Sequence, residues 1–325
     1  MAPNWLTFFS TRFSMERLIS QTGQRLIILL YHGVNDGEAI PFIDPLYPSR
    51  SAAAFEKDVQ FFTRYFESVD LKQIYERKGV FERPSFHITF DDGLRSVYDL
   101  ALPILQKCGV HASVYLNNNF IDNKGLFYRY KVALIIDRLK RNVSLKNKLG
   151  KFNPPNTIYQ WLKEMKYADT PKIDVVAHEI GLDFEEFLDG EKPYLSTEQI
   201  KEMQGLGVAF GAHSFDHQLV QDNTESMPSE IDKSMQDIYG RFGGDLRAFA
   251  FPFTDAGITD SDMQKLGSAF DISFGTAGLK VDSAQQHYQR IPMEKDNKDA
   301  ETIIKNAYLY FYLSRMIGKH KITRS

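Results

Sequence analysis

The sequence contains little cysteine and no excess of either charge, and both absences exclude classes of protein. One cysteine, Cys108, in 325 residues rules out an intrachain disulfide and a cysteine-based metal cluster. Lys and Arg number 39 against 42 Asp and Glu, so the chain offers no basic field for nucleic-acid phosphates. We therefore expect no nucleic-acid partner. Cys108 itself, in "LQKCGV", is typical of a helix end with a structural thiol.

Long apolar runs are also missing. The longest, "LIILLYHGV", is the size of a strand and far short of the ~18 apolar residues that span a bilayer. The N-terminal "MAPNWLTFFSTRFSMERL" has no uninterrupted apolar region, so we expect no signal peptide and a cytoplasmic location. At the C-terminus, "AETIIKNAYLYFYLSRMIGKHKITR" joins an aromatic helix to a basic tail. This helix either packs on the domain or makes a peripheral contact with the inner membrane surface.

Short apolar runs alternate with helical stretches along most of the chain. Strands separated by helices predict βαβ units and a parallel sheet or barrel, with the chemistry gathered where strands end. The runs that we expect to be strands are "RLIILLYHGV", "SFHITFDDG", "HASVYLNN", "GVAFGAHS", "AFAFPF" and "DISFGTAG". No internal repeat or low-complexity tract interrupts this pattern.

Two segments depart from the alternation. Residues 123–195 are helical and charge-rich but carry many aromatic and aliphatic side chains, which predicts a helical insertion rather than a solvated linker. Residues 296–325 form the C-terminal helix and basic tail. We expect one domain over residues 1–325 that contains both. After the insertion, Ser196 and Gln199 predict a capping box, and the strand that follows this helix ends at His213.

The stretch "HITFDDGLRS" places Asp91 and Asp92 directly after an apolar strand. A buried carboxylate is costly unless it has a partner such as a cation or an arginine. The sequence "GAHSFDHQL" offers His213 and His217, whose spacing of four lets two imidazoles converge on one metal ion. Two nitrogens and one carboxylate leave open positions on a divalent ion that activates water. One aspartate can then ligate while its neighbour accepts a proton.

With these motifs the sequence resembles the polysaccharide deacetylases with the NodB-homology domain, carbohydrate esterase family four. The resemblance rests on "TFDDG" (89–93), "HSFDH" (213–217), "FAFPF" (249–253) and "LLYHGV" (29–34). It implies a distorted (β/α) barrel of the α/β class that removes N-acetyl groups from a polysaccharide or a lipid-linked oligosaccharide. An N-acetylated glycan is then the expected substrate.

The resemblance also implies a role for each motif residue. Asp91 would be the general base. Asp92, His213 and His217 would hold a divalent metal, Zn²⁺ above all, with Co²⁺, Fe²⁺ or Ni²⁺ as alternatives. The Phe253 amide would stabilise the tetrahedral oxyanion. A cation beside Asp91 would keep that carboxylate ionised near neutral pH.

The sequence departs from the family pattern at two roles. Phe249 stands where the family carries the arginine that orients the base, so we expect Arg290 in "YQRIPME" to take over, with Arg95 as the weaker alternative. The family's late histidine motif is absent, and "QQHYQRI" offers only His287 as the acid that protonates the leaving amine.

Four further residues are expected to line the substrate site. His32 follows the first strand at its catalytic end, Phe251 and Pro252 belong to the third motif, and Tyr128 lies in the aromatic insertion. For His32 a purely structural role stays open. For Tyr128 core packing is the alternative to stacking on a sugar.

Two other functions fit parts of the sequence. A catalytically weak or inactive glycan-binding protein on the same fold would explain the irregular third motif. A non-haem Fe(II) oxygenase would use two histidines and one carboxylate in the same way, although its usual β-sandwich does not match an alternating chain. The intact Asp91, Asp92, His213 and His217 favour the deacetylase.

Overall fold

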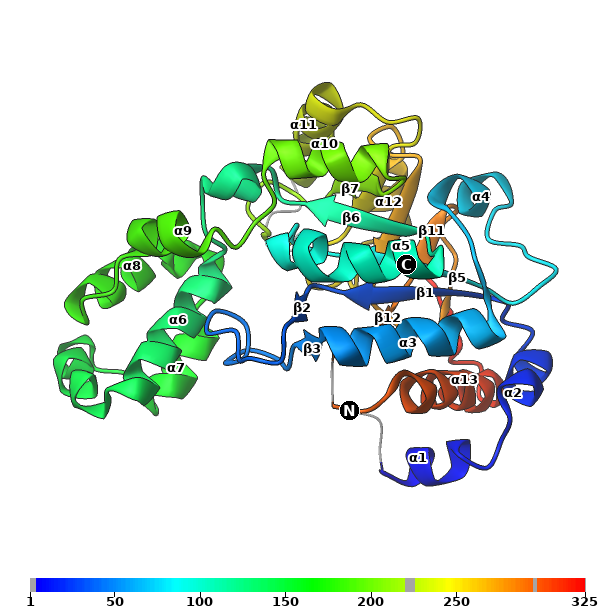
Figure 1. Cartoon of the computed structure of the whole chain (residues 1–325), viewed down its shortest axis with the longest axis horizontal. Helices are drawn as coiled ribbons and strands as arrows, with labels where there is room; N and C mark the ends of the chain where they lie inside the picture. The colour runs from blue at the N-terminus through cyan, green and yellow to red at the C-terminus, as the bar shows by residue number, and fades with distance from the viewer. Residues whose placement is uncertain (1–3, 220–225, 295–296, 325) are drawn as a thin grey trace.

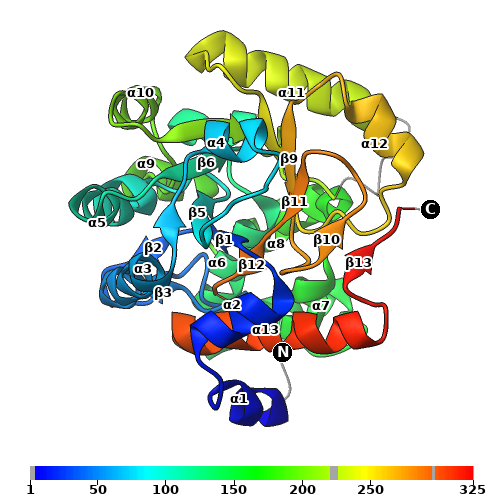
Figure 2. The same cartoon turned by 90° about the vertical axis from the view of Figure 1, so that its right-hand side faces the viewer.

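The computed structural model describes residues 4–219, 226–294 and 297–324. Its centre is a nearly closed barrel of parallel strands surrounded by helices, as the alternation in the sequence predicts (Figures 1 and 2). The barrel strands, in their spatial order, are β11 (His287–Gln289), β9 (Ile272–Gly275), β8 (Ala248–Ala250), β7 (Ala209–Ala212), β6 (Ala112–Leu116), β5 (Ser85–Phe90), β1 (Leu26–Tyr31) and β12 (Ile291–Pro292). The short β4 (Glu67–Ser68) pairs with the start of β5.

A single residue connects the two edge strands of the barrel sheet. Strand β11 pairs with β9 and strand β12 pairs with β1, and only Arg290 separates β11 from β12 along the chain. Arg290 therefore lies where the two edges of the sheet approach each other. Its side chain is fully buried and enters the barrel interior.

Most crossovers between barrel strands are helical. Outside the insertion, the helices of these crossovers are α3 (Ala52–Tyr65), α4 (Leu71–Glu76), α5 (Leu102–Cys108), α10 (Thr197–Gly205), α11 (Met227–Phe242) and α12 (Asp260–Leu266), with a π-helical turn at Val97–Ala101. Helix α10 begins with the expected capping box, in which the Ser196 hydroxyl accepts from the Gln199 amide. Apolar faces of α3, α5 and α11 bury Phe55, Leu105 and Ile231 against the strands.

The segment between β6 and β7 forms a helical arm at the C-terminal ends of the strands (Figure 1). It contains α6 (Tyr128–Arg141), α7 (Ile158–Glu164), α8 (Thr170–Glu179), α9 (Phe184–Glu191) and 3₁₀ segments at Asn118–Asn123, Val143–Phe152 and Tyr167–Asp169. Its apolar side chains, among them Ile135, Leu162 and Ile173, form a cluster separate from the barrel core. These helices therefore stand over the end of the barrel where parallel-barrel enzymes place their chemistry.

The N-terminal helices and the last helix of the chain pack together on one side of the barrel (Figure 2). Helix α13 (Ala300–Met316) packs against α1 (Asn4–Ser10) and α2 (Met15–Thr22). Its own residues Ile304 and Tyr308 are buried. The short strands β10 (Val281–Asp282) and β13 (Lys321–Ile322) then pair with each other, as do β2 (Val34–Asn35) and β3 (Arg50–Ser51). No helix in the described part of the chain has both the length and the apolar character that crossing a membrane requires.

Candidate active site

The predicted motif residues meet at the carboxyl ends of the barrel strands. Asp91 and Asp92 follow β5, His213 follows β7, and His32 follows β1. They line one cleft with a volume of about 460 Å³, together with Phe127 and Arg129 from the start of α6. Segments more than 180 residues apart in the sequence therefore converge because parallel strands present their ends on one face.

The turn after β5 has an unusual backbone. Asp92 has φ 70° and Gly93 has φ 66°, both in the left-handed region that costs energy for a residue with a side chain. A Cβ on residue 93 would lie 2.8 Å from a methyl carbon of Leu116, so only glycine fits there. The strained turn directs the two neighbouring carboxylates to different partners.

Asp91 is held by an arginine. The Arg290 guanidinium donates from both terminal nitrogens to the two Asp91 oxygens, at 2.6 and 2.8 Å, and its Nε donates to the carbonyl of Gly275 at 3.1 Å. Burial alone would raise the pKa of Asp91, but the charge of Arg290 and its hydrogen bonds lower it below the usual value. Arg95, the alternative, pairs instead with Asp99 and is partly exposed. Asp91 is thus an ionised carboxylate in a fixed orientation.

Asp92 faces the two histidines. Its Oδ1 lies 3.2 Å from Nε2 of His217 and 3.8 Å from Nε2 of His213. Buried Oδ1 has no hydrogen-bond partner among the described residues, and one ligand atom from each of the three residues falls within 4.8 Å of the others. Such an unpaired buried oxygen is costly without a cation. Burial would raise the pKa of Asp92, but His217 nearby lowers it below its usual value.

The tautomer of His213 suits metal ligation. Its Nδ1 lies 2.7 Å from the backbone carbonyl of Ala250, which can only accept, so Nδ1 carries the proton and Nε2 presents a lone pair. Burial lowers the pKa of His213 to about 4, which keeps the ring neutral at pH 7. Together with His217 and Asp92, His213 completes a set of two nitrogens and one oxygen that fits a divalent transition metal.

The second oxygen of Asp92 has a partner that sequence reasoning missed. The hydroxyl of Tyr130, on helix α6 of the insertion, donates to Asp92 Oδ2 at 2.5 Å. Burial and the Asp92 carboxylate raise the pKa of Tyr130 well above its usual value, so this hydroxyl stays protonated. The Tyr47 hydroxyl lies 3.2 Å from it and donates in turn. In the sequence, Tyr130 was one aromatic residue among many, and no local pattern marked it.

His32 is paired with Glu294, which the sequence analysis also missed. The His32 Nδ1 lies 2.6 Å from Glu294 Oε2, which also accepts from the His32 backbone amide at 3.0 Å. Burial alone would lower the pKa of His32, but the Glu294 carboxylate raises it to about 9. Both residues line the cleft, so an imidazolium stands opposite the aspartates at neutral pH.

The third motif divides between cleft and core. Phe253, with φ 58°, lines the cleft, and its ring lies 4.5 Å from that of His217, centroid to centroid. Phe251 is fully buried and packs at right angles on Phe249, so its predicted contact with substrate is wrong. Pro252 is buried and does not line the cleft either, so we correct that prediction too. The constraint on these two positions is packing.

Tyr128 lies beside the cleft rather than in it. Its ring centroid lies 6.5 Å from that of Phe253, and it lines an adjoining cavity formed by the insertion and the loop after β7. The stacking of Tyr128 on a sugar therefore stays a prediction.

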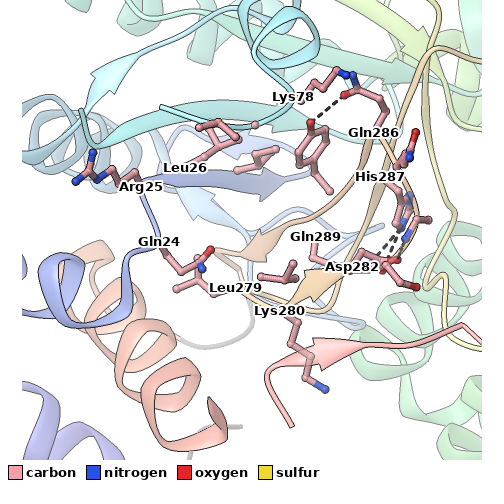
Figure 3. Close-up of a pocket in the computed structure, with 18 of the residues that line it drawn as sticks. Gln24, Arg25, Leu26, Lys78, Leu279, Lys280, Asp282, Gln286, His287 and Gln289 are labelled. Atoms are coloured by element: carbon pink, nitrogen blue, oxygen red, sulfur yellow. Dashed lines mark hydrogen bonds and ion pairs between the residues drawn. The ribbon is translucent and has the colours of Figure 1, made fainter. Parts of the chain in front are cut away.

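His287 lies in a different group of buried polar residues. Its Nε2 lies 3.0 Å from Asp255 Oδ2 and its Nδ1 lies 2.8 Å from the Ser273 hydroxyl. Figure 3 shows His287 beside Asp282 and Gln289 in a pocket at the amino end of the barrel, where the strands begin. His287 thus does not reach the cleft, and the prediction that it protonates the leaving amine is wrong. We name the group the Arg324 cluster; it consists of Asp255, Asp282, His287, Gln289 and Arg324.

Comparison with known proteins agrees with this geometry. The sequence model of the family described as polysaccharide deacetylase matches residues 78–272, more than half of the chain. None of the curated proteins searched matches this chain.

Three solved structures share its fold. The deacetylase PplD of Streptococcus pyogenes, solved with acetate, is 15% identical, with a TM-score of 0.56 over 87% of this chain and 97% of that one. A de-N-acetylase from Aggregatibacter actinomycetemcomitans is 15% identical, with a TM-score of 0.57 over 87% and 99%. IcaB from Ammonifex degensii is 15% identical, with a TM-score of 0.54 over 88% and 98%. The match over residues 78–272 establishes that this chain belongs to the polysaccharide deacetylase family.

Proposed function

We propose that this protein removes N-acetyl groups from a glycan by metal-assisted hydrolysis. Membership of the family supports deacetylation of a glycan. The observation that carries the finer proposal is the unpaired, buried Oδ1 of Asp92, which faces two imidazole nitrogens beside an ionised Asp91. A cation shared by Asp92 and the two imidazoles would satisfy this oxygen beside a carboxylate able to accept a proton.

Asp92, His213 and His217 would hold the metal. A site with two nitrogens and one oxygen favours Zn²⁺, and Co²⁺, Fe²⁺ and Ni²⁺ accept the same donors. When bound, the cation would lower the pKa of a coordinated water and polarise the acetyl carbonyl. Tyr130 fixes Asp92 by occupying its other oxygen, so a single carboxylate oxygen is left for the metal.

Asp91 would act as the general base. Arg290 keeps it ionised and fixes the carboxylate plane, and Oδ2 lies 3.7 Å from His213 Nε2, directly beside the proposed ligands. The attacking water would lose its proton to Asp91 as its oxygen bonds to the acetyl carbon. The same bidentate ion pair lowers the pKa of Asp91, so this base accepts protons only from an acidified water.

His32 would be the general acid in place of His287. With a pKa of about 9 it holds a proton at neutral pH, and Glu294 fixes Nδ1 so that Nε2 is the atom able to donate. That proton would pass to the amine nitrogen as the bond between carbon and nitrogen breaks. Phe253 also lines this cleft, and its amide is our choice for the donor to the tetrahedral oxyanion.

Acetate release tests this proposal. The purified protein should contain about one divalent metal per chain and release acetate from at least one of a panel of N-acetylated oligosaccharides. Asp91→Asn should keep the metal and lose activity at least about a thousandfold, since the base is gone. Asp99→Asn, an exposed aspartate on the following helical turn, is the matched control and should behave as wild type.

Two results would contradict the assignment. Acetate release by Asp91→Asn close to the wild-type rate would remove Asp91 as the base. A metal-loaded wild-type protein that binds N-acetylated glycans but releases no acetate from any of them would support a glycan-binding protein instead.

A further inference from the structure

Exposed apolar side chains gather on helices α1 and α13. In the described part of the chain eleven large hydrophobic side chains are exposed, and five of them lie on α1 or at the end of α13. We call these five the α1–α13 surface; they are Phe8, Phe9, Tyr310, Met316 and Ile317. A group of exposed apolar side chains on two packed helices indicates a contact site, and none of the roles assigned above uses it.

Helix α13 has apolar side chains on two opposite faces. One face, which includes Tyr308, is buried in the barrel core. The other face contains Asn306, Tyr310, Leu313 and Ile317, whose spacing of three and four residues places them in one stripe. Asn306 is buried and Leu313 is half-buried, whereas Tyr310 and Ile317 are exposed. The stripe thus becomes exposed along the second half of the helix.

Helix α1 covers the first half of this stripe and adds exposed rings of its own. The Ser10 hydroxyl donates to the Asn306 side chain at 2.6 Å, and Asn306 donates to the Thr7 hydroxyl at 3.0 Å. Phe8 and Phe9, between these two contacts, are 58% and 47% exposed. Figure 2 shows α1 beneath the first half of α13, with the second half continuing past it. The exposed rings of α1 and the exposed part of the stripe therefore lie on one side of the molecule.

The charges around this surface are positive. Residues 4–14 and 300–324 contain one acidic side chain, Glu301, and it pairs with Lys305 at 2.6 Å. Four further basic side chains of these segments are exposed: Arg12, Arg315, Lys319 and Lys321. The Arg12 guanidinium lies 3.9 Å from the Phe8 ring centroid, directly beside an apolar side chain. Acidic residues outnumber basic ones in the whole chain, so this excess of positive charge is local.

Apolar side chains beside unbalanced positive charge match the surface of an anionic membrane. Aromatic and aliphatic side chains enter the boundary between headgroups and acyl chains, while arginine and lysine contact the anionic headgroups. A second copy of this chain fits less well, because a two-fold contact through the same surface would bring the basic side chains of both copies together.

We propose that the α1–α13 surface binds this protein peripherally to a membrane that contains anionic lipids. Phe8, Phe9 and Ile317 would enter the headgroup region, and Arg12 and Lys319 would contact lipid phosphates. In Figure 1, α1 and α13 lie below the barrel, whereas the carboxyl ends of the strands and the insertion lie at its left end. The bound protein would therefore keep its cleft open. This inference goes beyond the deacetylase reaction and does not depend on it.

Co-sedimentation with vesicles tests the surface. The probes are vesicles of phosphatidylcholine alone and vesicles that also contain about 30% phosphatidylglycerol. Wild type should partition at least about tenfold more strongly to the anionic vesicles, and this preference should fall as NaCl rises from about 0.1 M to about 0.5 M, because salt screens the charges.

Variants of exposed residues locate the contact. The double variant Phe8→Ser with Ile317→Ser should reduce partitioning to anionic vesicles at least about tenfold. Leu206→Ser, which removes a leucine 47% exposed directly after α10, is the matched control and should partition as wild type. Lys319→Gln with Lys321→Gln should weaken partitioning about fivefold or more, whereas Lys201→Gln, at an exposed position on α10, should not.

Three results would overturn the proposal. Wild type could partition equally to both kinds of vesicle or to neither, or the Phe8 and Ile317 double variant could bind anionic vesicles as wild type does. Light scattering could instead show a wild-type dimer that this variant dissociates, without vesicle binding, which would assign the surface to a second copy. Acetate release from a soluble N-acetylated oligosaccharide should be equal in the variant and wild type, so failure of the deacetylase proposal leaves this test intact.

Discussion

Two buried groups of aspartate, histidine and arginine occur in this barrel, and they differ in how their oxygens are paired. The Asp92 cluster, at the carboxyl ends of the strands, consists of Asp91, Asp92, His213, His217 and Arg290. In both this cluster and the Arg324 cluster, three carboxylate or imidazole ligand atoms lie within 4.8 Å of one another. Residue types and distances alone would therefore assign a metal to each.

The pairing of charges separates the two clusters. In the Arg324 cluster, Arg324 forms ion pairs with both Asp255 and Asp282, and Gln289 donates to both at 2.6 and 2.9 Å. In the Asp92 cluster, Arg290 takes up only Asp91, and one oxygen of Asp92 is left facing two imidazoles. The carboxylates of the Arg324 cluster are hydrogen-bonded within the fold, whereas the unpaired Oδ1 of Asp92 is an acceptor that a cation would satisfy.

The Arg324 cluster also explains the C-terminal tail. Arg324 is 4% exposed and donates to the carbonyls of Asp255 and Ile258, so this basic residue of the tail anchors the loop that follows the third motif. Only part of the basic sequence, such as Lys319 and Lys321, is exposed. A peripheral membrane contact of this tail stays a prediction, and Arg324 would not take part in it.

Removing one residue from each cluster should give opposite results, and this is the largest effect that we expect. His213→Ala should lose the metal and all measurable acetate release, because two ligands do not retain a divalent ion in competition with water. Arg324→Met should keep one metal per chain but lower the free energy of unfolding by about 3–5 kcal/mol, because it leaves two buried aspartates uncompensated. Elemental analysis and chemical denaturation measure both quantities.

The comparison fails if both variants lose metal to the same extent while they remain folded. Arg324→Lys is the control for charge: it should recover part of the lost stability, although a single ammonium cannot replace the bidentate guanidinium.

The sequence predicted the features that depend on local pattern. Strand β5 ends in the two aspartates and β7 in His213, and a helical segment interrupts the alternation between β6 and β7. These follow from periodicity and turn residues, and the ends of parallel strands then gather on one face. Arg290 was named as the arginine that would orient the base, but its place between β11 and β12 could not be predicted from the sequence.

The remaining site residues depend on contacts across the chain. Tyr130 reaches Asp92 from a helix 38 residues away, and Glu294 reaches His32 across 262 residues, with no local signal for either. The error at His287 has a geometric cause. His287 stands three residues before Arg290, at the start of β11, where it pairs with Ser273 of β9. A strand rises ~3.3 Å per residue, so His287 lies ~10 Å from the catalytic end of the barrel. The sequence does not show how far His287 lies from the end of a strand.

The hydrogen bond from Tyr130 to Asp92 should contribute to metal binding by the Asp92 cluster. Tyr130→Phe removes the hydroxyl that fixes Asp92 and should weaken metal binding about ten- to a hundredfold, as loss of an outer hydrogen bond to a ligand does. Competition with a chelator measures the dissociation constant independently of activity. Tyr194→Phe, a buried tyrosine whose ring stacks on Tyr130 and whose hydroxyl accepts from the Phe127 amide, is the matched control. Equal affinities in the two variants would show that the contact serves packing alone.

The smallest effect that we expect is a change in the pH dependence of kcat/KM, caused by the pair of His32 and Glu294 beside the Asp92 cluster. Because Glu294 raises the pKa of His32 to about 9, the acid is charged below that pH, and kcat/KM should decline as pH rises through about 9. Glu294→Gln removes the charge and leaves burial, which lowers the pKa, so the decline should move to lower pH by at least about one unit. The stabilisation from this pair follows the same sign: it is complete below about pH 6.5 and is lost as pH rises through about 9. Glu38→Gln, at an exposed position after β2, should leave the pH profile unchanged. A decline that stays at about pH 9 in Glu294→Gln would mean that another group supplies the proton, since His32 without its carboxylate cannot remain protonated there.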